Sequence, residues 1–150
     1  MIILDTNVLS ELMKSRPAAE VLDWMAAQLA ASLYTTSIAQ AEILHGVMLL
    51  PAGRRRRALE AAATSMFAED FGGRILGFGT ESAPPYARIA SDRRRAGRPI
   101  SHFDAQIAAI ARSTGAAVAT RNLTDFDGCG VTLVDPWSHR SGRTRTSTTV

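Results

Sequence analysis

Short apolar runs alternate along the chain with longer segments in which apolar residues recur every three or four positions. The short runs predict buried strands, and the longer segments predict amphipathic helices. Because predicted strands and helices follow one another in turn, we expect an α/β fold with a Rossmann-like, mostly parallel central sheet and helices on both faces. The predicted strands are residues 2–5, 33–36, 74–77, 116–120 and 131–134.

Capping and breaking residues predict where the helices begin and end. Ser37 and Gln40 fit a capping box at the start of one helix, and Pro51 and Gly53 follow its end. The predicted helices are a short one ending near Lys14, then residues 17–29, 37–50, 54–71, 84–96 and 103–112.

Three acidic residues occupy positions that are predicted to be buried or half-buried, where a carboxylate is unfavourable. Asp5 follows an apolar strand, and in a parallel sheet ligands collect at the carboxyl ends of the strands. Glu42 shares a helix face with Ile38, Ala39, Gly46 and Leu49, and Asp104 lies on an equally apolar helix face. Buried carboxylates need partners, and oxygen ligands suit Mg²⁺ or Mn²⁺. We therefore expect Asp5, Glu42 and Asp104 to converge on one divalent cation.

Each of these acids also has a simpler interpretation. Asp5 can be the N-cap of the first helix, and Ser101 with Asp104 fits a capping box. Glu42 can be a surface glutamate if the phase of its helix is misjudged. A fourth cluster, Thr120, Asn122 and Asp125, follows another predicted strand, where the alternative is an ordinary polar loop.

Charge and composition exclude some classes of function but do not by themselves identify one. The chain has 17 basic and 14 acidic residues, and the excess comes from three arginines near the C-terminus. Arg93, Arg94 and Arg98 are candidates for contacting an RNA backbone, although arginine runs are more often solvated helix faces. A single cysteine, Cys129, excludes an internal disulfide framework and a cysteine zinc site.

Length and hydropathy predict one domain. We expect residues 1–137 to form it and residues 138–150, rich in Ser, Thr, Arg and Gly, to be a disordered tail. No apolar stretch approaches the roughly 18 residues of a membrane span, and no signal peptide pattern is present. We therefore expect a cytoplasmic protein.

Several motifs, in this order and spacing, resemble the PIN-domain ribonucleases, and specifically the VapC-type toxins of toxin–antitoxin pairs. The resemblance extends from Met1 to Trp137. The motifs are residues 2–8, 37–42, 97–100, 104–111, 119–122, 125–126 and 134–137.

The resemblance implies a PIN fold that binds Mg²⁺ or Mn²⁺ and cuts single-stranded or loop RNA. It implies that Asp5, Glu42 and Asp104 are the catalytic, metal-binding acids. Members often have a fourth acid where this chain has Asn122, so either Asp125 substitutes for it or three acids suffice. Thr6, Asn7 and Thr120 match supporting polar positions of the family.

The resemblance also implies partners: a homodimer, silenced by a small antitoxin that inserts a basic side chain into the acidic site. The apolar helices at residues 17–29 and 37–50 are compatible with a partner groove, or are simply core helices.

Two other functions remain open from the sequence. A haloacid dehalogenase-like phosphatase also begins with a strand ending in Asp, but it requires a second Asp where this chain has Asn7, and a late Lys where it has only Lys14. The other alternative is a PIN fold that binds RNA or a partner without turnover.

Overall fold

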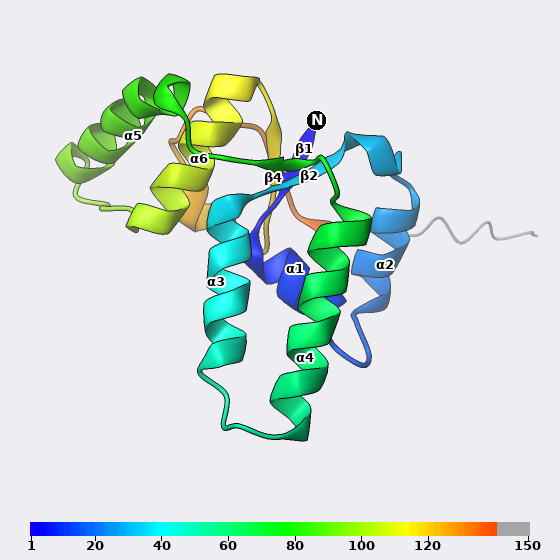
Figure 1. Ribbon diagram of the computed structural model, residues 1–150. Coiled ribbons are helices and arrows are strands. Elements are labelled where there is room, and N and C mark those ends of the chain that lie inside the picture. Colours follow the sequence, from blue (N-terminus) through cyan, green and yellow to red (C-terminus); the bar gives the residue numbers. More distant parts are fainter. Residues whose placement is uncertain (141–150) are drawn as a thin grey trace, which may run out of the picture.

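The computed structural model describes residues 1–140 and contains a five-stranded, entirely parallel sheet (Figure 1). The strand order is β3-β2-β1-β4-β5. The strands are β1 (Ile2–Leu4), β2 (Leu33–Thr36), β3 (Ile75–Leu76), β4 (Ala117–Ala119) and β5 (Leu133–Val134). The predicted parallel sheet is confirmed; β2 has the predicted bounds, and the other four strands are shorter than predicted.

Helices cover both faces of this sheet. Successive residues of a strand point to opposite faces, and Ile3 and Leu4 of β1 are both fully buried, so neither face is open to water. The helices are α1 (Thr6–Leu12), α2 (Ala19–Ala26), α3 (Ser37–Met48), α4 (Arg54–Ser65), α5 (Ala83–Arg95) and α6 (His102–Thr114). In Figure 1, α3 and α4 lie side by side and project beyond the sheet, whereas α5 packs against α6.

The most buried helix is α6. Five consecutive residues, from Ile107 to Ala111, are shielded from solvent, which requires contacts around most of the helix. The helix begins at the N-cap Ser101 and ends at Gly115, whose left-handed φ of 70° suits glycine. Contacts with α5, α3 and β4 hold the helix and so fix the location of Asp104 in its first turn.

Most helix boundaries differ from the prediction by a few residues, and two of the differences have a clear physical cause. The helix predicted over 54–71 ends at Ser65 and continues as a π turn, Met66–Asp70, closed by a bond from the Phe71 N–H to the Met66 carbonyl. The wider turn lets Met66, Phe67 and Phe71 all enter the core. The N-cap of α3 is Thr36 and not Ser37, because Thr36 keeps extended backbone and its Oγ1 accepts from the Ala39 N–H.

The predicted domain, residues 1–137, and disordered tail, residues 138–150, stay predictions. Pro136–Ser138 form a short 3₁₀ turn, capped by the Asp135 side chain. The remainder of the predicted tail, from residue 141 onward, lies outside the described residues. None of the helices within residues 1–140 has the length and apolar character that crossing a bilayer requires.

The central pair of strands positions the polar residues that follow them. β1 and β4 are neighbours, and the Asp5 N–H donates to the Ala119 carbonyl at 3.0 Å. The residues after β1 and after β4 therefore emerge together at one edge, as expected for parallel strands.

The assignment of Thr36 as the N-cap of α3 can be tested by a pair of substitutions. Thr36→Val keeps the shape of the buried side chain but leaves the Ala39 N–H without its acceptor, so we expect a loss of about 1–2 kcal/mol in the free energy of unfolding. Ser37→Ala, at an exposed position, should change it by less than about 0.5 kcal/mol. Urea denaturation measures both, and equal losses would contradict the assignment.

Candidate functional site

A polar cleft of about 390 Å³ lies at the carboxyl edge of β1 and β4. It brings together Asp5, Glu42, Asp104 and Asp125, which come from four different segments of the chain. The other residues that line it are Thr6, Asn7, Ser10, Glu11, Lys14, Arg121, Asn122 and Trp137. Thr120 lies beneath the cleft and is fully buried.

Asp5 is the most enclosed of the acids, with 4% of its surface exposed. One carboxylate oxygen accepts from the Thr6 N–H at 2.7 Å, and the other accepts from the Thr120 hydroxyl at 2.9 Å. The first contact makes Asp5 the N-cap of α1. The capping and site interpretations of Asp5 are thus both compatible with the structure.

Glu42 is half-buried on α3, where its Oε1 accepts from the Thr6 hydroxyl at 3.0 Å. Thr6 consequently contacts two acids, Asp5 through its backbone and Glu42 through its side chain. The predicted apolar face around Glu42 holds near the sheet but fails at Leu49, which is 72% exposed. The reason is that the end of α3 projects beyond the sheet (Figure 1).

Asp104 is half-buried in the first turn of α6. Its backbone N–H donates to the Ser101 hydroxyl at 3.1 Å, so the predicted Ser101 cap is confirmed. The cap accounts for the backbone of Asp104, while its side chain lines the cleft.

Thr120 connects the acids to the loop after β4. Its hydroxyl donates to Asp5 and accepts from the Asn122 N–H at 3.1 Å and from the Asn7 amide at 3.4 Å. The Asn7 side-chain oxygen in turn accepts from the Arg121 N–H. These supporting polar residues therefore join the ends of β1 and β4 into one network.

The site carries excess negative charge. Burial raises the pKa of Asp5 to about 6, with a smaller contribution from the charges of Asp104 and Glu42 and against the hydrogen bonds from Thr6 and Thr120. Burial likewise raises the pKa of Glu42, where Asp104 adds repulsion, and the pKa of Asp104, where Asp125 adds repulsion. Among residues 1–140, no ion pair involves Asp5, Glu42 or Asp104.

The donor set fits a hydrated divalent cation better than a bare one. In the part of the chain that the structure describes, no three His, Cys, Asp or Glu side chains come close enough to hold a metal ion by themselves. The expected convergence therefore takes the form of a shared cleft and not of a ready-made cage, because like charges repel and Thr6 lies between Asp5 and Glu42. A divalent cation that keeps several waters needs few direct carboxylate ligands, and the cleft is compatible with one.

The three candidate RNA-binding arginines do not line the acidic cleft. Arg93 is buried, with its guanidinium bonded to backbone carbonyls, which argues against contact with RNA. Arg98 is exposed but pairs with Asp127 at 3.0 Å, and Arg94 is exposed on α5. The prediction of direct RNA contact is therefore wrong for Arg93, because its position on α5 points the side chain under the loop of residues 123–129.

Two cationic residues that the sequence did not single out do line the cleft. Lys14 pairs with the buried Glu11 at 2.6 Å, and the guanidinium of Arg121 lies 5.2 Å from the centre of the Trp137 ring. The signal for Arg121 was its position directly after Thr120, at the end of a central strand. Lys14 had no such signal, because its place depends on how α1 ends.

A second groove, about 840 Å³ in volume, runs between α1, α3 and α4 and meets the acidic cleft at Thr6 and Glu42. Its walls are mainly apolar. They include Met13, Ile43, Val47, Leu50 and Leu59. Helix α3 thus contributes to this groove as anticipated, whereas no residue of α2 lines it.

Comparison with known proteins agrees with this arrangement. Residues 2–127 match the PIN domain family. The chain is 39% identical to the plasmid stability protein StbB of Pseudomonas syringae pv. tomato, over 91% of this chain and 99% of that protein. It is 36% identical to VapC ribonuclease Y4jK of Sinorhizobium fredii, over 91% and 98%. It is 35% identical to toxin FitB of Neisseria gonorrhoeae, over 91% and 99%.

Solved structures give the same result. FitAcB from Neisseria gonorrhoeae superposes with a TM-score of 0.85 at 35% identity, covering 92% of this chain and 99% of that chain. DNA-bound VapBC from Salmonella typhimurium superposes with a TM-score of 0.75 at 25% identity, covering 90% and 97%.

The raised pKa of Asp5 predicts how the stability of the metal-free protein depends on pH. The pKa of this carboxyl is about 6 in the folded protein and 3.8 for an ordinary Asp, so protonation favours folding. This contribution is fully present below about pH 4 and is lost as the pH rises through 6. Ionised Asp5 therefore lowers stability at pH 7.5 by at most about 3 kcal/mol.

Asp5→Asn should then stabilise the protein in chelator at pH 7.5. We expect a gain of about 1–2 kcal/mol, since the amide replaces only one of the two accepting oxygens. At pH 4 the gain should vanish. Thermal unfolding at both pH values measures this, with Asp23→Asn on the exposed side of α2 as a control for loss of a surface carboxylate. A destabilised variant at pH 7.5 would contradict the account.

Proposed function

We propose that this chain, which belongs to the PIN-domain family and to its VapC-type toxins, is a Mg²⁺- or Mn²⁺-dependent endoribonuclease that cleaves single-stranded or loop RNA in the acidic cleft. The observation that carries the proposal is the meeting of Asp5, Glu42 and Asp104 in one cleft, with raised pKa values and, in the described residues, no ion-pair partner. A divalent cation would offset these charges.

The acids would divide the work according to their surroundings. A bound cation supplies charge neutralisation at the phosphate and lowers the pKa of water. Asp5, held by Thr6 and Thr120, is the most rigid ligand. Asp104 is half-buried in the cleft and its pKa is raised by burial and by the charge of Asp125, so we assign it to orienting the attacking water and accepting its proton.

RNA would be held next to the acids by the cationic side chains of the cleft wall. Arg121 is exposed, its guanidinium lies over the Trp137 ring, and within residues 1–140 it forms no ion pair. A planar guanidinium suits a phosphate, because it can donate two parallel hydrogen bonds. Lys14 would contribute less, since Glu11 already neutralises it.

The proposal includes an antitoxin partner and a homodimer, as well as a cytoplasmic location, where RNA and such a partner are found. The apolar groove between α1, α3 and α4 has the form that an amphipathic helix occupies. Because the groove opens at Glu42, an arginine on that helix would reach the carboxylates and block the cation site.

The alternatives have less support. A haloacid dehalogenase-like phosphatase conflicts with the match to the PIN domain over residues 2–127. A PIN fold that only binds RNA would have no reason to keep three costly carboxylates in one cleft. Measured turnover separates this last alternative from the proposal.

Asp104→Asn should therefore reduce RNA cleavage by at least about 100-fold at saturating Mn²⁺, because the amide cannot accept the proton of the water. Chelator should stop cleavage by the parent protein. Asp92→Asn on α5 removes an exposed carboxylate of the same kind and should cleave at the parental rate. Cleavage by Asp104→Asn at the parental rate, in preparations free of other nucleases, would refute the assignment.

A second test concerns the partner groove. Production of the protein alone should slow growth, and production of a small protein encoded next to it should restore growth and yield a complex. Leu59→Asp places a charge in the groove, so it should weaken that complex at least about tenfold, as a buried unpaired charge requires. Leu22→Asp, at an exposed position on α2 outside the groove, is the matched control. Equal binding by both variants would argue against the groove.

A further inference from the structure

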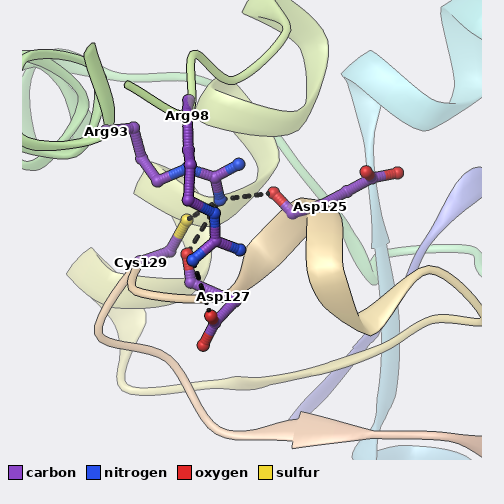
Figure 2. Close-up of polar contacts among 5 residues, drawn as sticks. All are labelled: Arg93, Arg98, Asp125, Asp127 and Cys129. Carbon is purple, nitrogen blue, oxygen red and sulfur yellow. Dashed lines mark hydrogen bonds and ion pairs between the residues drawn. The ribbon is translucent and has the colours of Figure 1, made fainter. Parts of the chain in front are cut away.

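Arg93 is the one arginine of residues 1–140 that is buried, with 8% of its surface exposed. It lies near the end of α5, and its Nε donates to the Arg98 carbonyl at 2.7 Å. One terminal nitrogen, Nη1, donates to the carbonyls of Asp125 at 2.9 Å and Asp127 at 2.8 Å. Figure 2 shows the guanidinium of Arg93 bonded to the loop at Asp125 and Asp127.

These contacts hold a segment that has little other structure. Residues 123–129 contain only the 3₁₀ turn Leu123–Phe126, followed by the buried Cys129. Hydrogen bonds from a charged donor are stronger than neutral ones, so Arg93 is a firm anchor for this loop. The exposed ion pair between Arg98 and Asp127, at 3.0 Å, adds a weaker second contact.

The loop carries an acid of the cleft. The carbonyl of Asp125 faces Arg93, whereas its carboxylate points the opposite way, as Figure 2 shows. That carboxylate lines the same cleft as Asp104, and its charge contributes to raising the pKa of Asp104. The backbone contact with Arg93 thus fixes the direction in which the Asp125 side chain projects.

We propose that Arg93 is a positioning residue that holds Asp125 in the cleft as the fourth acid toward the divalent cation, in place of the neutral Asn122. The inference rests on the proposed metal-dependent function and deepens it. The guanidinium of Arg93 bonds backbone carbonyls, so its positioning of Asp125 passes through the backbone, while its charge separately acts to lower the pKa of Asp104. A purely structural role for Arg93 would instead lower stability without depending on the Asp125 side chain.

A double-mutant cycle on Mn²⁺ affinity separates the two roles. We expect Arg93→Met and Asp125→Asn each to weaken Mn²⁺ binding by about tenfold, and the double variant to be no weaker than either one. Isothermal titration of folded protein measures the affinity directly, and circular dichroism establishes that each variant is folded. Arg95→Met removes a charge from the same helix at a side chain that is 78% exposed, and its affinity should match the parent.

Arg93→Lys is measured beside Arg93→Met, since it keeps the charge that acts on Asp104 but not the planar fork of donors, and it replaces Arg93→Met if that variant does not fold. Losses that add up in the double variant would show that Arg93 acts without Asp125 and would overturn the inference. Unchanged Mn²⁺ affinity in Asp125→Asn would overturn it as well. Neither result touches the proposed function, which fails only if Asp104→Asn continues to cleave RNA.

Discussion

The hydrogen bond from Thr120 to Asp5, 2.9 Å long and buried, joins the residues that follow the two central strands. The parallel pairing of β1 with β4 makes this bond possible, because it brings both strand ends to one edge. Thr120 also accepts from Asn7 and Asn122, so the start of α1 and the loop after β4 are fixed relative to each other. The other acids are arranged around this fixed point.

The same arrangement lowers the stability of the protein whenever no cation is bound. Burial and mutual repulsion raise the pKa of Asp5, Glu42 and Asp104, so their ionised forms are disfavoured without a counter-charge. Either a cation or an arginine from a partner would relieve this repulsion, and the two would compete for the same carboxylates. Because such a site is stabilised by any bound cationic group, it suits a nuclease that is controlled by a tightly bound inhibitor.

Sequence patterns predicted the parallel sheet and the shared location of the acids, because both follow from strand order and helix periodicity. They did not predict the π turn at Met66–Asp70, which depends on how Phe71 reaches the core. The arginine run also gave a wrong candidate for RNA contact, Arg93, because tertiary packing decides whether a helical arginine faces solvent or a loop. Arg121 was missed as a cleft residue for a similar reason: its orientation depends on Trp137, which is close in space but distant in sequence.

The central claim is that the acids form one divalent cation site, and anomalous diffraction from crystals soaked in Mn²⁺ tests it most directly. The account predicts one principal anomalous peak in the cleft, about 2.1 Å from carboxylate oxygens of Asp5 or Asp104, with waters completing the coordination. Glu42 should contact this ion directly or through one of those waters. A cleft without a peak at saturating Mn²⁺, or a peak bound only by residues outside it, would contradict the account.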